Sequence, residues 1–126
     1  EPVYINGDGE ISRDFCYVEN AIQANVLAAT TETPAALNQV YNVAVAERTT
    51  LNELFEMERV LLEEHYPWAC ESHPQYREFR TGDVLHSQAD ISKGERLLGY
   101  APTHRIRAGL GEAIRWYVEN LPRNAG

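Results

Sequence analysis

The sequence is poor in the features that stabilise or anchor several classes of protein. Of 126 residues only Cys16 and Cys70 are cysteines, so no framework of disulfides is available, and two thiols in a domain of this size are typical of a reducing compartment. The apolar runs are short, and no basic stretch followed by an apolar one opens the chain, which predicts neither a membrane span nor a secretory signal. We therefore expect a cytoplasmic protein with no membrane partner.

Basic residues are also scarce. The sequence has 19 Asp and Glu against 11 Lys and Arg, which gives a net charge of -8, and no basic cluster offers a footprint for a phosphate backbone. We therefore expect no nucleic-acid partner. Only Lys93 is a lysine, and the bias toward arginine suits bidentate contacts to phosphate but also follows from base composition.

The motifs of a complete oxidoreductase are absent from the sequence. The pairs Gly7/Gly9 and Gly109/Gly111 each stop at two glycines, so no G-x-G-x-x-G cradle for a pyrophosphate is present. No G-x-S-x-G elbow occurs, and Lys93 has an alanine four residues before it, which excludes a Tyr-x-x-x-Lys pair. No catalytic residue and no cofactor-binding residue is predicted from these motifs.

The pattern that is present predicts one α/β (α+β) domain over residues 1–126, with a small mixed sheet and about four helices. Too few strands are available for a complete doubly wound sheet. Strands or extended segments are expected at residues 4–6, 11–18, 39–45 and 76–81, and helices at residues 19–31, 50–65, 90–99 and 106–121.

Three local signals support these elements. Thr50 followed by Glu53 predicts a capping box, and Gly99 predicts a left-handed helix end. The dipeptide Asp8-Gly9 is typical of a hairpin turn. Residues 39–45, "QVYNVAV", are apolar and β-branched, which predicts a strand buried on both faces in a parallel sheet. The chain also begins directly on a strand pattern, from which we expect it to be the later part of a longer polypeptide.

Two groupings of polar residues have simple explanations. His65, Cys70 and His73 have a spacing that could offer three metal ligands, but a proline-broken surface loop explains them better because no fourth ligand is evident. Glu63 and Glu64 could serve acid-base chemistry, yet at a glutamate-rich helix end they indicate a solvated face. We predict no metal site.

Two arginines are more informative. Arg13 and Arg80 each lie near the predicted end of a strand, and a pair of guanidinium groups could clamp a diphosphate. The alternative for either arginine is an ion pair with Asp14 or Asp83. Asp83 could accept a hydrogen bond from a ribose hydroxyl, or it could simply follow the turn that begins at Gly82.

Four successive stretches resemble one family. "INGDGEISRDFCYVEN", "QVYNVAVAERTTLNEL", "REFRTGDVLHSQADISKGERLLGYAP" and "GLGEAIRWYVENL" look like the C-terminal signatures of nucleotide-sugar epimerases of the extended short-chain dehydrogenases/reductases. They look most like the UDP-N-acetylglucosamine 4-epimerases of bacterial polysaccharide pathways. The resemblance runs from Pro2 to Leu121 and covers about the last third of such an enzyme, the substrate-binding domain without its Rossmann domain.

The resemblance implies roles for six residues. Arg13 and Arg80 would meet the UDP diphosphate, and Asp83 would bind the uridine ribose. Tyr4 and Asn6 match the strand that lines the uracil, and Tyr4 would be the stacking residue because Asn6 stands where many relatives have an aromatic side chain. The small side chain of Ser87 would face the hexose and leave room for a 2-acetamido group.

The resemblance also implies what the whole enzyme does. A tightly bound NAD would oxidise the sugar at its 4-position and return the hydride to the other face, with the NAD-binding and catalytic residues on the absent Rossmann domain. This chain alone would bind the UDP-sugar but not catalyse, would bind no cofactor, and could self-associate through the surface left by that domain. The alternatives are a freestanding nucleotide-sugar-binding or interaction module and the C-terminal part of a related dehydratase or decarboxylase.

Overall fold

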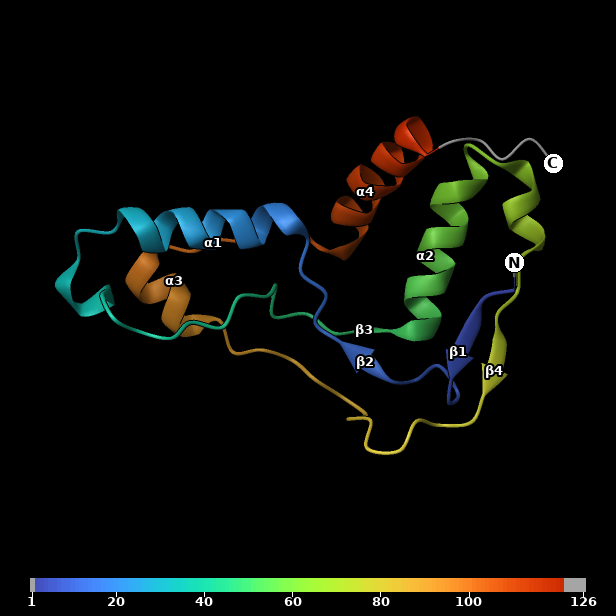
Figure 1. Ribbon diagram of the computed structural model, residues 1–126, viewed down its shortest axis with the longest axis horizontal. Helices are drawn as coiled ribbons and strands as arrows, with labels where there is room; N and C mark the ends of the chain where they lie inside the picture. The colour runs from blue at the N-terminus through green and yellow to red at the C-terminus, as the bar shows by residue number, and fades with distance from the viewer. Residues whose placement is uncertain (1, 122–126) are drawn as a thin grey trace.

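The computed structural model describes residues 2–121, in which four α-helices and two small sheets form an elongated molecule (Figure 1). The helices are α1 (Val18–Thr30), α2 (Leu51–Glu63), α3 (Ser92–Leu98) and α4 (Ile106–Asn120). Two short 3-10 turns, η1 (Pro34–Ala36) and η2 (Pro67–Glu71), follow α1 and α2. The expected fold class, a small mixed set of strands with about four helices, is confirmed.

The strands form two pairs of opposite sense. Strand β1 (Tyr4–Asn6) pairs in parallel with β4 (Gln75–Arg77), and β2 (Ser12–Arg13) pairs antiparallel with β3 (Thr49–Thr50). The hairpin expected at Asp8-Gly9 is therefore wrong. The turn forms, with positive φ at Gly7 and Gly9, but it carries the chain from one sheet to the other instead of returning β2 onto β1.

Local sequence signals fix the helices. Thr50 and Glu53 form the predicted capping box, in which the Thr50 hydroxyl accepts from Glu53 N–H and the Glu53 carboxylate accepts from Thr50 N–H. These hydrogen bonds from Thr50, first from its backbone and then from its side chain, lower the pKa of Glu53. Gly99 ends α3 in the left-handed conformation, with φ 69°, as predicted. Asp90 is not the cap residue of α3 but accepts from Ser92 N–H two residues later.

The strand expected at residues 39–45 is wrong. These residues are extended but unpaired, and no backbone-to-backbone hydrogen bond joins them to another segment within residues 2–121. Val40 is 85% exposed, whereas Ala44 and Val45 are buried. Asn42, which would have needed buried partners in a strand, lies at the surface and donates to the Asp90 carbonyl. The described part of the chain therefore provides no neighbouring strand with which residues 39–45 could pair.

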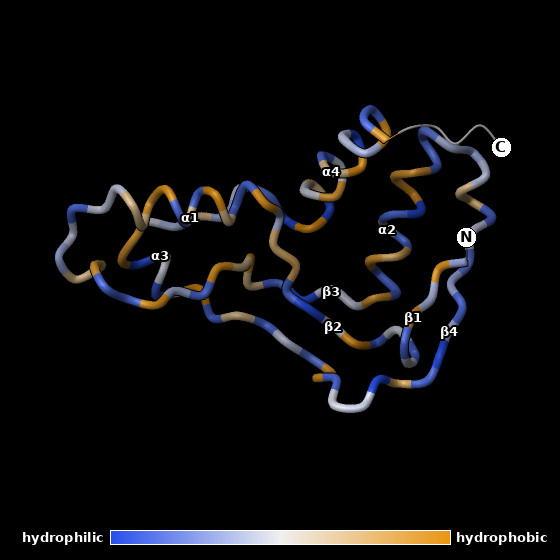
Figure 2. Tube along the Cα trace, in the orientation of Figure 1, coloured by the Kyte–Doolittle hydropathy of each residue, from blue (hydrophilic) through white to orange (hydrophobic). Residues whose placement is uncertain are grey.

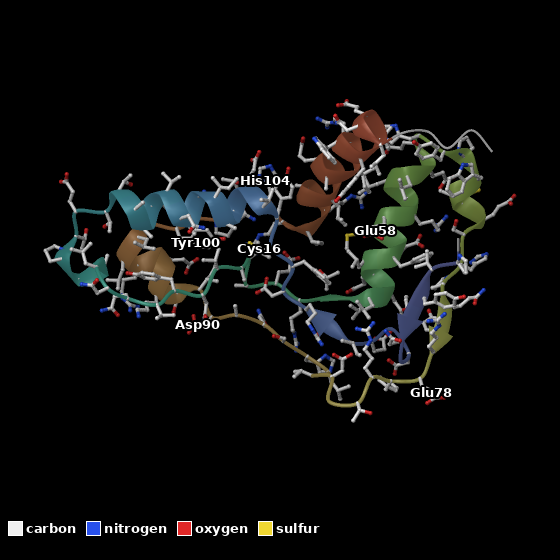
Figure 3. The ribbon with its side chains drawn as sticks, in the orientation of Figure 1. Cys16, Glu58, Glu78, Asp90, Tyr100 and His104 are labelled. Atoms are coloured by element: carbon white, nitrogen blue, oxygen red, sulfur yellow. The ribbon has the colours of Figure 1, made fainter. Side chains whose placement is uncertain are left out.

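The core lies where α1, α3 and the segment before β3 meet. Ala24, Ala44, Ile91 and Tyr100 form a buried cluster, and the Tyr100 hydroxyl donates to the Ala44 carbonyl at 2.8 Å. Cys16 lies beside Tyr100 (Figure 3). Burial, and then the neighbouring Cys16, raise the pKa of Tyr100 to about 12.

Helix α1 has an exposed apolar face. The sequence pattern places Ile22, Val26 and Ala29 on one stripe, and Val18 precedes them at the same spacing. Val18, Ile22 and Val26 are each more than half exposed, and Figure 2 shows hydrophobic positions recurring along this helix. Helix α1 packs on α3 through its opposite side, with Ala24 buried. The described helices are all too short or too polar to cross a membrane.

Candidate functional site

Strand β1 carries the first two predicted site residues. Tyr4 and Asn6 lie two apart on a strand and so share one face, while Ile5 between them is buried. In the parallel register Asn6 lies opposite Arg77, and the Arg77 guanidinium carbon is 3.2 Å from the centroid of the Tyr4 ring. One face of the Tyr4 ring is therefore covered by a cation.

Asn6 meets Arg80 across the gap between β1 and the loop after β4. With the amide oriented so that its oxygen faces Arg80, that oxygen accepts from Nε and Nη2 at 3.0 and 3.2 Å. Asp83 N–H donates to the Arg80 carbonyl at 3.2 Å, and Gly82 between them has φ 85°. The guanidinium and the carboxylate thus belong to one tight turn.

The same turn reaches β2. Arg13 Nη2 lies 3.4 Å from the Asp83 carboxylate, and Arg13 Nη1 donates to the Ser12 carbonyl at 2.9 Å. Both charged side chains remain about a third exposed, at 30% and 33%. Of the two ion pairs considered for Arg13, the structure has the one with Asp83. Asp14 instead accepts from the backbone N–H groups of Val45 and Ala89.

Ser87 is held beside the same strand. Its backbone N–H donates to the Ser12 carbonyl at 3.1 Å, and Ser12 N–H donates to the Leu85 carbonyl at 2.9 Å. Its side chain is exposed. We call the six predicted residues the anchor site: Tyr4, Asn6, Arg13, Arg80, Asp83 and Ser87. Hydrogen bonds and the turn connect five of them, and the sixth, Tyr4, lies two residues before Asn6 on β1.

The charges of the anchor site leave a cation available. Arg80 contacts a neutral amide and makes no ion pair within residues 2–121. The charge of Arg13 is only partly compensated, because its contact with Asp83 is long, at 3.4 Å, and both side chains are about a third exposed. Two guanidinium groups against one carboxylate give the site a surplus of positive charge in a chain of net charge -8. Such a site suits an anionic ligand that has a polar, hydroxylated neighbour.

Sequence reasoning missed two residues of this surface. The Phe79 ring packs on Gly7, where an added Cβ would lie 2.3 Å from a ring carbon, and half of its area stays exposed beside Arg80. His86 shares a hydrogen bond of 2.9 Å with the Ser12 hydroxyl. No sequence signal identifies His86, because its partner is 74 residues away. Phe79 could have been noticed as an aromatic residue directly before Arg80.

The two rejected groupings have no site in the structure. Among residues 2–121 no set of three His, Cys, Asp or Glu side chains could hold a metal ion, so His65, Cys70 and His73 do not form one. Glu63 lies on the exposed side of α2 and pairs with Arg59 at 3.8 Å, one turn before it. The exposure of Glu63 agrees with the solvated helix face that the sequence indicates.

A separate apolar groove of about 310 Å³ lies between α2 and α4. Phe15, Leu54 and Ile106 line it, together with the carboxylate of Glu58. Figure 3 shows Glu58 on α2, apart from the loop that carries the anchor site. Burial raises the pKa of Glu58 because the ionised carboxylate loses water in this groove. None of the six anchor residues lines the groove.

Comparison with known proteins identifies a family. A family model described as GDP-mannose 4,6 dehydratase matches residues 1–113. A putative UDP-glucose 4-epimerase of Methanocaldococcus jannaschii is 28% identical over 92% of this chain, which spans 34% of that relative. The chain therefore covers about a third of the length of the curated relatives that it matches.

Two solved structures superpose on nearly the whole chain. The UDP-N-acetylglucosamine 4-epimerase of Methanobrevibacter ruminantium M1, in complex with UDP-N-acetylmuramic acid, has a TM-score of 0.80 and 35% identity over 94% of this chain and 35% of its own. A substituted UDP-glucuronic acid 4-epimerase of Bacillus cereus, in complex with UDP-4-deoxy-4-fluoro-glucuronic acid and NAD, has a TM-score of 0.79 and 29% identity over 97% and 36%.

The matched residues include those of β1, β2 and the loop from Phe79 to Ser87. The superposed neighbours are nucleotide-sugar epimerases, each covered over about a third of its length. The chain therefore belongs to the GDP-mannose 4,6-dehydratase family of extended short-chain dehydrogenases/reductases, as a partial chain related to its nucleotide-sugar epimerases and dehydratases.

Proposed function

We propose that this chain is the UDP-sugar-binding part of an NAD-dependent 4-epimerase that acts on UDP-N-acetylglucosamine or UDP-glucose, and that it is not catalytic alone. The observation that supports this most is the turn at Arg80–Asp83, which presents a guanidinium without a carboxylate partner among residues 2–121 and meets Arg13 of β2 through Asp83. A diphosphate beside a ribose is the ligand that such a grouping would recognise.

Each anchor residue has a part in this proposal. Arg80 and Arg13 bind the diphosphate, which displaces part of the weak contact between Arg13 and Asp83. Asp83, released from that contact, accepts from a ribose hydroxyl. Binding energy from the nucleotide, which does not react, then holds the sugar in place while chemistry proceeds at its 4-position.

Three residues complete the pocket. Tyr4 and Asn6 border the uracil from β1, and the small side chain of Ser87 leaves room for a 2-acetamido group on the hexose. Because Arg77 covers one face of the Tyr4 ring, a base can stack on Tyr4 only from its other face. The amide of Asn6, already bonded to Arg80, couples the base end of the pocket to the diphosphate end.

NAD would supply hydride transfer in the whole enzyme, as a nucleotide cofactor does generally. No residue of this chain is assigned to it, because the sequence has no glycine-rich pyrophosphate cradle. The part of this chain is to bind and orient the UDP-sugar.

The partner of the chain would be an N-terminal domain that supplies the strands missing here. Residues 39–43 offer an unpaired extended edge, and Val18, Ile22 and Val26 of α1 offer an apolar face in the same half of the molecule (Figure 1). Both surfaces would be covered if residues 39–43 joined a parallel sheet of the partner domain and α1 packed on the face of that sheet. Without this partner we expect the chain to self-associate through these residues.

A calorimetric titration tests the proposal. We expect saturable binding of UDP and of UDP-N-acetylglucosamine to the chain, and loss of that binding in Arg80→Ala. Arg115→Ala is the matched control, because Arg115 is an exposed arginine of α4 paired with Glu112 and distant in sequence from the anchor site. Binding that survives Arg80→Ala unchanged would contradict the proposal.

A second candidate is the C-terminal part of a related nucleotide-sugar dehydratase, which the description of the matching family model favours. The anchor site would then bind the same kind of nucleotide, and the reaction would differ in the N-terminal part. The product formed by the chain joined to its natural N-terminal part separates the two: a 4-epimer supports the first candidate, and a 4-keto-6-deoxy sugar supports the second.

A further inference from the structure

Ser12 is an unusual residue for its place in the molecule. It lies on a two-residue strand directly before Arg13, yet it is only 4% exposed. Its three polar groups all have partners: its N–H donates to the Leu85 carbonyl, its carbonyl accepts from Ser87 N–H and from Arg13 Nη1, and its hydroxyl bonds His86 Nδ1 at 2.9 Å. Through these hydrogen bonds, Ser12 connects β2 to the loop after β4, and we call this connection the junction.

The side-chain bond to His86 is the part of this junction that substitution can remove. With the ring protonated at Nε2, the Ser12 hydroxyl donates to Nδ1. A buried hydroxyl without a partner is unfavourable, so loss of His86 would favour separation of the two segments. The neighbouring charged groups are Arg13 and Asp83, which already contact each other.

We propose that Ser12 and His86 are positioning residues, which together set the orientation of the Arg13 guanidinium and the place of Ser87. The geometry that carries the proposal is the double use of the Ser12 carbonyl, which accepts from Arg13 and from Ser87 at once. If the loop moves away from β2, Arg13 loses its fixed acceptor and its contact with Asp83 together. The consequence for ligand binding rests on the proposed function; the orientation of Arg13 does not.

Side-chain NMR of the ligand-free chain tests the orientation directly. We expect an ordered Arg13 Nε–H group in the natural sequence, with a positive heteronuclear NOE, and loss of that order in His86→Ala. His86→Asn, which places an amide oxygen near the position of Nδ1, should restore most of it. Arg115, whose only described partner is one turn away on the same helix, is the internal control and should not change. An Arg13 that stays equally ordered in His86→Ala overturns the proposal.

Binding supplies the second measurement. We expect His86→Ala to raise the Kd for UDP on the order of tenfold and His86→Asn to raise it much less. Ser12→Ala removes the same bond but leaves no buried hydroxyl unpaired, so it should raise the Kd no more than His86→Ala does, and the double variant should show no further loss beyond His86→Ala. Additive losses would overturn the proposal. If Arg80→Ala leaves UDP binding unchanged, the proposed function fails, while the Arg13 order still decides on the junction.

Discussion

Two halves of the molecule differ in how many of their side chains find partners within the chain. In one half, β1 to β4, α2, α4 and the loop of residues 78–88 form what we call the anchor region; in the other, α1, η1, residues 37–46 and α3 form the docking region (Figure 1). The polar groups of the anchor site are connected across three segments, β1, β2 and the loop of residues 78–88. The docking region has a small core but leaves an apolar helix face and an extended segment exposed.

This difference separates the proposed binding site from the part of the chain that lacks a neighbouring strand. Within residues 2–121, Asn6 already contacts Arg80, and Arg13 contacts Asp83. Residues 39–43 have the composition of a buried strand, but none of the strands described for residues 2–121 lies beside them. We infer that the anchor region is formed in this chain and that the docking region is completed by the domain proposed above.

The largest expected effect comes from the joint between the two regions. Asn20, at the start of α1, is fully buried; its amide donates to the His104 carbonyl, and its oxygen accepts from the N–H groups of Thr103 and His104. Asn20→Ala should lower the free energy of unfolding by about 3 kcal/mol, because it leaves several buried backbone groups unpaired. Asn25→Ala, which removes one exposed bond on the same helix, should change it by less than about 1 kcal/mol.

Chemical denaturation followed by circular dichroism measures both variants. If the two asparagine substitutions have equal effects, the joint does not hold the regions together, and the comparison between them loses its structural basis.

Tyr100, in the core of the docking region, should make the stability of the chain depend on pH in the alkaline range. Tyr100→Phe removes the hydroxyl bond to Ala44 and should cost about 1–2 kcal/mol at neutral pH. Because the folded-state pKa of Tyr100 is raised to about 12, the unfolded phenol ionises first, and stability falls as pH rises above about 10. The substituted chain should lose less stability than the natural one between pH 9 and 11, a range set by the ordinary tyrosine pKa of about 10. An identical pH dependence of melting would contradict this.

A matched pair of glycines tests packing in the anchor region. Gly7 and Gly82 both have positive φ, but an added Cβ meets the Phe79 ring at Gly7 and nothing within 4 Å at Gly82. Both alanine variants should lose about 1 kcal/mol from backbone strain, and Gly7→Ala should lose about 1 kcal/mol more from displacement of Phe79. Gly7→Ala should also weaken UDP binding through Phe79 and Arg80, and Gly82→Ala through strain in the Arg80–Asp83 turn. If thermal denaturation shows equal losses of stability for the two variants, Phe79 moves aside at no cost, and the expected packing at Gly7 is contradicted.

The smallest expected effect on stability is at Val40. This side chain is almost fully exposed and packs on nothing that it would lose, so Val40→Lys should change the free energy of unfolding by less than about 0.5 kcal/mol. It should, however, reduce self-association in sedimentation velocity, because a charge on the edge opposes pairing. A strictly monomeric natural chain at high concentration would contradict the docking role of this segment.

The sequence predicted the helices well because their determinants are local. The capping box at Thr50 and the glycine at Gly99 lie within a few residues of the ends they fix, and α4 begins at the predicted residue. The strand at residues 39–45 could not be judged locally, because a strand exists only with a neighbour. The same reason explains the hairpin error at Asp8-Gly9, where the partner of β1 comes from residues 75–77.

For the candidate site, too, the local features could be predicted from the sequence and the long-range contacts could not. Arg13, Arg80 and Asp83 could be named from their motifs, and their assigned roles stay predictions. Their mutual contacts, and the parts of Phe79 and His86, depend on segments about 70 residues apart and needed the structure. The exposed stripe on α1 was predicted as a stripe, but periodicity alone does not say whether this chain or another covers it.

The most direct test of the account is a titration of the isotope-labelled chain with UDP-N-acetylglucosamine, followed by amide chemical shifts. The account predicts saturable shifts that gather in residues 4–13 and 79–88, with residues 18–43 of the docking region unchanged. Shifts that gather instead on α1 and residues 39–43, or no saturable shift at all, would contradict the claim that the anchor region of this chain binds the nucleotide on its own.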